Sequence, residues 1–431
     1  MAWLRRVRAR SRGGRKLVAA LGRRGERVLD GRVLARAGKI VEAVRRGGDG
    51  ALVRAVRRHD GVVVRSAEAL RLPLPAAAYE DLPAGFEGAL ERAITAVERY
   101  HRQQVRRGIR LFENGVELEE RRTPLERVGV YVPGGRAAYP STVVMTVVPA
   151  RLAGVGEVVV ATPPASWQHS PALRFTLKRL GVEEIWGMGG AQAVAALAYG
   201  TESVRRVDKI VGPGNAWVTA AKHLVSAEVA IEGLAGPSEV VILASDEADA
   251  ELIAADLLAQ AEHDPQALAL LVTESKGLVK QVERALGRQL RQLATAAVAK
   301  RALHDQGAAL LVEDLEEGLA LVEALAPEHL QLVGRRAEAL ADRVRRAGAV
   351  FIGESTPEVF GDYLAGPSHV LPTGGTARFA SALGVDDFVR RHHVIRFDRA
   401  AAERSAAAAA TLAEVEGLPA HAASARLRLG R

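Results

Sequence analysis

Short apolar runs alternate with amphipathic segments over most of this chain. A first series predicts strands at 128–132, 157–161, 184–187 and 208–211, and helices at 142–152, 171–180, 191–199 and 216–226. A second series predicts strands at 239–244, 267–273, 308–312 and 349–352, and helices near 250–261, 276–293 and 315–325. Such alternation is typical of parallel sheets with helices on both faces. We therefore expect an α/β fold of two doubly wound, Rossmann-like domains with a cleft between them, plus small helical pieces at both ends.

The rest of the chain predicts smaller elements. Helices are expected at 32–46 and 50–59, with Gly47 and Gly48 between them, and at about 85–106. Alternation over 111–122 around Asn114-Gly115 predicts a β-hairpin, and an Ala-rich helix begins at Arg399. The expected domains are a basic N-terminal extension or helix at 1–24, a discontinuous first α/β domain at 25–130 and 239–384, a second at 131–238, and a C-terminal helical tail at 385–431.

Composition narrows the function classes. The chain has 431 residues and no cysteine, which excludes disulfides and cysteine nucleophiles, and it has no long apolar run that would span a membrane. The net charge of +8 comes from residues 1–24, which carry eight Arg, one Lys and no acid. This segment is compatible with a solvated terminal helix, a nucleic-acid-binding tail or an organellar transit peptide.

Glycine-rich turns follow three strands of the first series, at Gly134-Gly135, Gly189-Gly190 and Gly212-Pro213-Gly214. In doubly wound sheets ligands bind at the carboxyl ends of the strands, where glycines let the backbone approach a phosphate. None of the three turns is a complete G-x-G-x-x-G motif. They predict either a nucleotide site or simple tight turns.

Gln260 and His263 lie three residues apart at the end of a predicted helix, so both side chains point the same way. Together they offer half of a metal site, and the alternative is a histidine that interacts with the helix dipole. Asp362 and His421 are further candidate ligands, and Glu416 is a candidate substrate-binding group. Nitrogen and oxygen donors of this kind suit zinc or another divalent metal.

Glu328 and His329 place a carboxyl group beside an imidazole after Pro327. Such a pair can act as an acid/base relay if both side chains face a cleft from a loop. The alternative is the start of a helix, with Pro327 at its first position.

Several segments together resemble the histidinol dehydrogenase family, in family order over roughly residues 30–425. They are TPLERVGVYVPGG (123–135), GGAQAVAALAYGTE (189–202), KIVGPGN (209–215), AGPSE (235–239), QAEH (260–263), PEHL (327–330), GDY (361–363), HVLPTGGTA (369–377) and EGLPAH (416–421). Two positions depart from the family pattern: Glu232 stands where an aspartate is expected, and Ser368 where many members have Asn.

The resemblance implies a set of functional residues. It implies one zinc ion per subunit, bound by Gln260, His263, Asp362 and His421. It implies NAD near Tyr131, Gln192 and Asn215 on the 131–238 domain, and Glu328 and His329 as the catalytic acid/base pair. The implied substrate-binding residues are Ser238, Gln260, His263, His329, Asp362, Glu416 and His421. The family is a homodimer whose C-terminal tail crosses over, so Glu416 and His421 would serve the partner's site.

The implied reaction is the four-electron oxidation of L-histidinol to L-histidine through L-histidinaldehyde, with two NAD, as the last steps of histidine biosynthesis in the cytoplasm. Many aldehyde dehydrogenases attack the aldehyde with a thiolate. This chain has no cysteine, so we expect water addition to the aldehyde, with Glu328 activating the water and His329 relaying protons. Zinc would mainly orient the substrate.

Three other functions stay open at this stage. A relative of the same fold could oxidise another primary alcohol, such as a sulfonated diol. A nucleic-acid-binding protein acting through residues 1–24 is disfavoured because aromatic residues make up only 4% of the chain and the basic charge is confined to that segment. A zinc hydrolase is disfavoured because it needs no nucleotide cleft.

Overall fold

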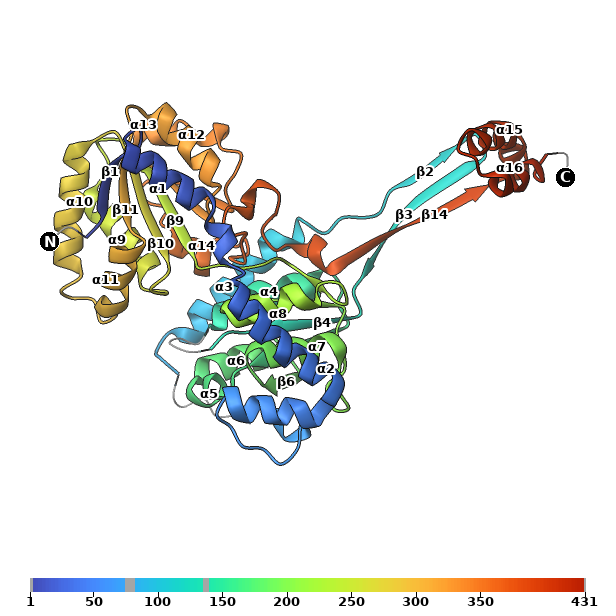
Figure 1. Ribbon diagram of the computed structural model, residues 1–431, viewed down its shortest axis with the longest axis horizontal. Helices are drawn as coiled ribbons and strands as arrows, with labels where there is room; N and C mark the ends of the chain where they lie inside the picture. Colours follow the sequence, from blue (N-terminus) through green and yellow to red (C-terminus); the bar gives the residue numbers. More distant parts are fainter. Residues whose placement is uncertain (1–2, 74–81, 135–138, 430–431) are drawn as a thin grey trace.

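The computed structural model describes residues 3–73, 82–134 and 139–429. Its body contains two parallel sheets, from which a long arm projects (Figure 1). The first sheet, sheet A, has the strand order β1-β11-β10-β9-β12-β13, and all its neighbouring strands are parallel. These strands are β1 (Arg5–Arg8), β9 (Glu239–Ala244), β10 (Leu268–Thr273), β11 (Ala308–Leu311), β12 (His329–Val333) and β13 (Ala349–Ile352).

Helices cover both faces of sheet A. One face carries α9 (Ala250–Ala261), α10 (Lys276–Gln289) and α11 (Ala296–Asp305), and the other carries α1 (Arg12–Gly22), α12 (Leu315–Leu325) and α13 (Arg335–Glu338). Strand β9 serves both faces, because Val240 and Ile242 pack in the first core cluster while Val241 and Leu243 pack in the second. This burial on both faces explains the continuous apolar run in the sequence.

Sheet B has the strand order β6-β5-β4-β7-β8 and is also parallel throughout. Its strands are β4 (Arg127–Tyr131), β5 (Glu157–Thr162), β6 (Glu184–Gly187), β7 (Lys209–Val211) and β8 (Ala230–Ile231). One face is covered by α2 (Gly31–His59), α7 (Gly190–Tyr199) and α8 (Ala216–Val225), and the other by α3 (Phe86–Arg102), α4 (Pro140–Leu152) and α6 (Pro171–Arg179), with α5 (Pro164–His169) beside α6. The two doubly wound sheets confirm the predicted fold class.

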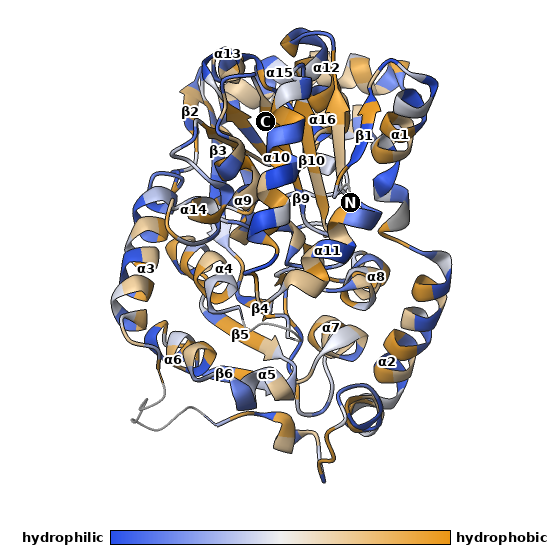
Figure 2. Cartoon of the chain, turned by 90° about the vertical axis from the view of Figure 1, so that its left-hand side faces the viewer, coloured by the Kyte–Doolittle hydropathy of each residue, from blue (hydrophilic) through white to orange (hydrophobic). Residues whose placement is uncertain are grey.

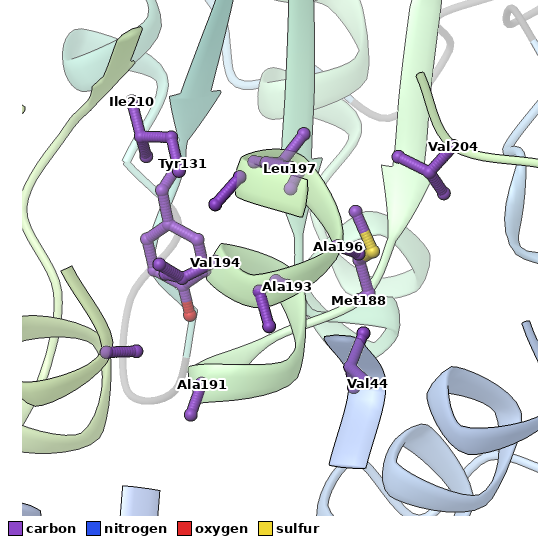
Figure 3. Packing of buried hydrophobic residues seen from close by; sticks show 14 of the residues in the cluster. Val44, Tyr131, Met188, Ala191, Ala193, Val194, Ala196, Leu197, Val204 and Ile210 are labelled. Carbon is purple, nitrogen blue, oxygen red and sulfur yellow. The ribbon is translucent and has the colours of Figure 1, made fainter. Parts of the chain in front are cut away.

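The core of sheet B is built around the Ala-rich helix α7. Its small side chains let it pack closely between the sheet and α2, where Val194 and Leu197 meet Val44 and Ile210 in one buried cluster (Figure 3). In both sheets the apolar residues gather on the strands and on the helix faces turned toward them (Figure 2). The close packing fixes the position of α7 against sheet B.

The N-terminal half is divided between the sheets differently from our expectation. The sequence predicts residues 25–130 in one domain with 239–384, but α2 packs on α7 and α8, and α3 packs on α4, so both helices belong to sheet B. The pattern of a helix shows its apolar face but not which sheet that face meets. Helix α2 bends at Gly48 (φ 47°), where the sequence predicts a break. The predicted boundary between the two domains, at residues 130 and 131, also falls within β4, one residue before that strand ends at Tyr131.

The Arg-rich N-terminus is part of sheet A. Residues 5–8 form the edge strand β1, which pairs with β11 in parallel, and α1 follows with Ser11 as its N-cap. Several of its arginines meet acids of the domain, as in the ion pairs Arg6–Glu283 and Arg10–Glu317. A terminal helix is one of the three interpretations that the sequence offers for residues 1–24, and α1 is such a helix. The strand β1 is not predicted.

The arm consists of a three-stranded antiparallel ribbon and a helical tip. The ribbon has the order β14-β3-β2 and contains β2 (Arg110–Glu113), β3 (Val116–Pro124) and β14 (Val389–Phe397), with Asn114 and Gly115 at positive φ in the predicted hairpin turn. The tip is formed by α15 (Arg399–Val415) and α16 (Pro419–Arg426), which stand away from the body (Figure 1). Among the described residues no helix is long and apolar enough to cross a membrane.

Candidate active site

Strands β9 and β12 lie side by side in sheet A, and their first residues form the centre of the candidate site. Glu328 directly precedes β12, and His329 is its first residue. Helix α12 ends at Ala326 in the left-handed conformation (φ 46°), and the chain turns straight into the strand. The helix-start alternative for Glu328-His329 is therefore wrong, and the loop interpretation holds for Glu328 alone, because His329 already belongs to the strand. The loop enters a strand, however, rather than leaving one.

The backbone of Glu239, the first residue of β9, holds both members of the pair. Its N–H donates to Glu328 Oε2 at 2.8 Å, and its carbonyl oxygen accepts from His329 Nδ1 at 3.0 Å. Because a carbonyl can only accept, the hydrogen of His329 is on Nδ1, and Nε2 is left as a proton acceptor. Glu328 and His329 are neighbours in the sequence, and the parallel pairing of β9 with β12 sets the geometry of their side chains.

Burial shifts the pKa values of Glu328 and His329 in opposite directions. Both side chains are only 8% exposed. Burial raises the pKa of the Glu328 carboxyl well above its ordinary value, with the charge of Glu239 adding to the effect. Burial lowers the pKa of His329, and the carboxylate of Asp362 opposes that change. At neutral pH His329 is therefore an uncharged base, and Glu328 is a carboxyl group that protonates more readily than an exposed one.

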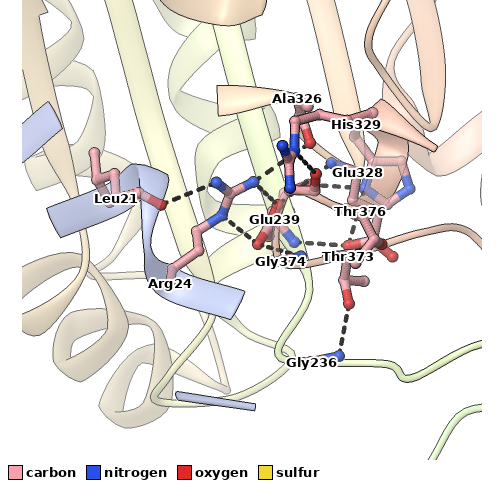
Figure 4. Close-up of polar contacts among 12 residues, drawn as sticks. Leu21, Arg24, Gly236, Glu239, Ala326, Glu328, His329, Thr373, Gly374 and Thr376 are labelled. Carbon is pink, nitrogen blue, oxygen red and sulfur yellow. Dashed lines mark hydrogen bonds and ion pairs between the residues drawn. The ribbon is translucent and has the colours of Figure 1, made fainter. Parts of the chain in front are cut away.

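The carboxylate of Glu239 is held in place by residues far away in the sequence. Arg24 donates to both of its oxygens at 2.6 Å, and Gly374 N donates to Oε1 at 2.9 Å (Figure 4). Arg24 also reaches Leu21 O and, at 3.5 Å, Ala326 O. The described contacts thus connect the Arg-rich segment with the strand that holds Glu328 and His329.

The predicted metal ligands of the body come from α9 and from α14 (Glu358–Tyr363), two helices that pack together. Gln260 is buried, and its Nε2 has no hydrogen-bond partner. His263 lies two residues beyond the last residue of α9, and its Nδ1 donates to Ala259 O at 3.0 Å, which leaves Nε2 free. The charges of Asp362 and His263 both act on His329 and on His369, so these groups face one space.

This donor set fits a zinc ion with one ligand missing. A buried amide without a partner, a free imidazole nitrogen and a carboxylate are suitable ligands. Within the described part of the chain no group of three or more His, Cys, Asp or Glu side chains is placed to hold a metal ion. The fourth predicted ligand, His421, lies exposed on α16 at the tip of the arm, and Glu416 lies exposed at the end of α15. The structure does not bring these two residues to the site of their own chain.

Further polar residues around the pair were missed. Glu358 is buried four residues before Asp362 on the same helix, 3.9 Å from His329 Nδ1, and burial raises its pKa well above the ordinary value. The imidazole of His369 donates from Nδ1 to Asp362 O at 3.0 Å. The helical spacing of Glu358 and Asp362, and the presence of His369 in a quoted motif, were the available signals. Of the predicted substrate residues, Ser238 is half-buried directly before β9.

The three predicted cofactor residues lie at the carboxyl end of sheet B. Tyr131 ends β4, and its hydroxyl accepts from Gly190 N at 3.1 Å, pointing toward the start of α7 (Figure 3). Burial raises the pKa of Tyr131 to about 12. Gln192 lies on the first turn of α7, and Asn215 caps α8 by accepting from Trp217 N at 3.0 Å. Of the glycine turns, Gly135 lies outside the described residues.

Comparison with known proteins identifies the family. A sequence profile described as histidinol dehydrogenase matches residues 24–429. The chain belongs to the histidinol dehydrogenase family. The histidinol dehydrogenase of Caulobacter vibrioides is 48% identical over 393 residues, which cover 90% of this chain and 91% of that protein. The Synechococcus histidinol dehydrogenase is 47% identical over 394 residues, with the same coverage.

A solved structure supports the same assignment. The crystal structure of histidinol dehydrogenase from Elizabethkingia anophelis superposes with a TM-score of 0.89 at 29% identity, covering 99% of this chain and 98% of that one. The resemblance seen in the sequence motifs is confirmed, and the chain is a dehydrogenase by family. The family match begins at Arg24, the residue that holds Glu239.

Proposed function

We propose that this enzyme oxidises L-histidinol to L-histidine through L-histidinaldehyde, with two NAD, as the last steps of histidine biosynthesis. The observation that carries the proposal is the Glu328–His329 pair, held on the backbone of Glu239 in a chain of this family. A general base and a second acid/base group side by side suit two successive oxidations of one carbon.

In the first oxidation His329 removes the alcohol proton. Its Nδ1 is held by Glu239 O, so Nε2 takes the proton as hydride leaves the carbon. The lowered pKa keeps Nε2 unprotonated at neutral pH, and the carboxylate of Asp362 stabilises the imidazolium that forms. The products of this step are the aldehyde, one reduced cofactor and one proton.

In the second oxidation Glu328 activates a water molecule. The carboxylate takes a proton from the water while the water oxygen adds to the aldehyde carbon, and the carbonyl oxygen takes up the proton that His329 accepted in the first step, which gives the hydrated aldehyde. Loss of hydride and of a hydroxyl proton, which His329 accepts, then leaves the carboxylic acid. No thiolate route is open, because the chain has no cysteine. The two groups lie close together, with 3.8 Å between His329 Nδ1 and Glu328 Oε2, which supports a role for both at one reacting carbon.

One zinc ion per subunit would be held by Gln260, His263, Asp362 and His421. When bound, it would supply a Lewis acid that fixes the substrate's nitrogen and oxygen atoms, and bound NAD would supply the hydride acceptor. Tyr131, Gln192 and Asn215 would contact NAD at the carboxyl end of sheet B. Ser238 and Glu416 would bind the substrate together with Gln260, His263, His329, Asp362 and His421.

A homodimer completes the proposed site. Glu416 and His421 are exposed at the tip of an arm that stands away from the body (Figure 1). The tip also exposes large apolar side chains, with Leu412 66% and Val415 82% accessible. Surfaces of this kind are normally covered by a partner. We propose that the arm crosses to a second copy and delivers both residues to its site.

The test is to measure NAD reduction with purified protein and L-histidinol, with and without a zinc chelator, counting NADH per histidinol consumed. Two NADH per histidinol, loss of activity on chelation and recovery with zinc are expected. A ratio of one, or activity that resists complete metal removal, would contradict the proposal. A sulfonated diol serves as the comparison substrate, and faster oxidation of that diol would favour the alternative activity. The cytoplasmic location stays a prediction.

A further inference from the structure

The turn between β6 and α7 has the form of a phosphate-binding loop. The strand ends at Gly187, Gly189 is the N-cap, and α7 begins with Gly190 at φ 58°. A glycine turn leading from a parallel strand into a helix is where dinucleotide folds commonly bind a phosphate, because free backbone N–H groups point outward there. The predicted cofactor residue Gln192 lies on the first turn of this helix.

In this protein a carboxylate of the chain itself occupies the turn. Oδ2 of Asp60 accepts from Gly189 N at 3.1 Å and from Gln192 Nε2 at 2.9 Å. The next donor, Gly190 N, is bound to the hydroxyl of Tyr131. The backbone of Asp60 is itself fixed, because Asp60 caps the C-terminus of α2 and its N–H donates to Val56 O at 2.8 Å. The α7 N-terminus thus already binds an internal anion.

The close contact leaves little room for another anion beside Gly189. A Cβ atom added at Gly189 would lie 2.7 Å from Asp60 Oδ1 and 3.1 Å from Pro163 Cγ. The backbone therefore touches the carboxylate on one side and a proline ring on the other. Because Gln192 donates its amide N–H to Asp60, its carbonyl Oε1 is left as the available acceptor.

We propose that Asp60 is a positioning residue for the dinucleotide cofactor: it takes the place of a phosphate at α7 and holds Gln192 with its carbonyl oxygen free for a hydroxyl or amide of NAD. The inference rests on the proposed function, in which Gln192 contacts NAD. It also means that the diphosphate of the cofactor binds away from this turn, since the negative charge of Asp60 repels it.

The experiment measures NAD affinity by calorimetry on the full-length Asp60→Ala, Asp60→Asn and Gln192→Ala variants and on the Asp60→Ala/Gln192→Ala double variant. Asp60→Ala is expected to raise the Kd for NAD about tenfold, as loss of a hydrogen bond to a charged group does. The double variant is expected to bind like Gln192→Ala, because Asp60 acts through that residue. Asp314→Ala is the matched control, since Asp314 caps α12 in sheet A through a 2.8 Å bond to Glu317 N.

A second measurement tests whether the turn at Gly189 can bind a phosphate group once the carboxylate of Asp60 is removed. Inorganic pyrophosphate is expected to raise the melting temperature of Asp60→Ala but not of the wild type, because only the variant frees Gly189 N. Unchanged NAD affinity in both Asp60 variants, additive losses in the double variant, or no gain of pyrophosphate stabilisation would overturn the inference. Wild-type protein that binds no NAD would instead overturn the proposed function, and the inference with it.

Discussion

Arg24 and Glu239 form a buried, bidentate ion pair across a sequence separation of 215 residues, with both N–O distances at 2.6 Å. Their side chains are 11% and 4% exposed. Because the backbone of Glu239 carries the hydrogen bonds to Glu328 and His329, the Arg24–Glu239 ion pair connects the N-terminal segment with the proposed acid/base groups. Arg24 therefore serves the site without facing the substrate.

Replacing Arg24 should destabilise the folded protein and lower its turnover rate. Arg24→Ala leaves the carboxylate of Glu239 buried without its charged partner, which commonly costs about 3–5 kcal/mol of the free energy of unfolding. Urea unfolding measures this loss, and kcat should fall as the catalytic pair loses its fixed support. Arg23→Ala, which changes an exposed neighbour, is the control. The Arg24→Met/Glu239→Gln double variant should recover much of the stability. If Arg24→Ala unfolds like the control, the pair is not important for stability.

Elements with a continuous apolar run were predicted well. The strand at 239–244, the strand at 184–187 and the helix at 315–325 have the predicted bounds, because their core contacts are local and periodic. Capping was less predictable. Asp249, and not a residue nearer to β9 such as Ser245, caps α9, since Ser245 N is bound to Val333 O in the neighbouring strand.

Long-range partners explain what the sequence could not indicate. Strand β1 reads as RRVR, and only its pairing with β11, some 300 residues away, makes it a strand. In the same way nothing local marks Arg24 or Asp60, whose roles arise from Glu239 and Gln192 in other elements. Glu328 and His329, which a sequence motif suggested, do lie together on the backbone of Glu239, and their catalytic role stays a prediction.

Glu328→Gln should block aldehyde oxidation more than alcohol oxidation. The amide keeps the shape and can still accept from Glu239 N, but it cannot take a proton from water. Loss of a general base usually costs about 10²- to 10⁴-fold in rate. The measurement is single-turnover NADH formation from L-histidinaldehyde and from L-histidinol. Glu228→Gln, an exposed glutamate, is the control. A variant that oxidises the aldehyde as fast as the wild type does would exclude Glu328 as the water-activating base.

The two oxidations should respond differently to acid. Burial lowers the pKa of His329, so the base of the first step stays neutral as pH falls through its ordinary value of about 6.5. Burial raises the pKa of Glu328 well above its ordinary value, so the base of the second step is protonated earlier on the same descent. Between pH 8 and pH 6 we expect aldehyde oxidation to weaken first.

An aldehyde trap tests this order. Semicarbazide should capture more L-histidinaldehyde at pH 6 than at pH 8, and the NADH formed per histidinol should fall from two toward one. In Glu328→Gln the second step should lose this pH dependence, because the titrating group is gone. Equal pH profiles for alcohol and aldehyde oxidation in the wild type would show that one group limits both steps.

The crossing arm predicts rescue between two inactive chains. In the proposed dimer each site takes Asp362 from one chain and His421 from the other. An Asp362→Ala chain and a His421→Ala chain should each be inactive alone. After co-refolding in equal amounts, half of the dimers are mixed and each mixed dimer has one intact site, so activity should return to about one quarter of the wild type.

The matched control separates crossing from nonspecific recovery. Asp362→Ala mixed with Gln260→Ala should stay inactive, because both changes lie in the body and every site of a mixed dimer keeps one of them. Glu416 and His421 are exposed on the arm, and neither residue reaches the site of its own chain. In the proposed dimer both therefore act in the site of the second copy. Absence of rescue in the first mixture, with dimers confirmed by light scattering, would mean that His421 acts in its own chain or not at all.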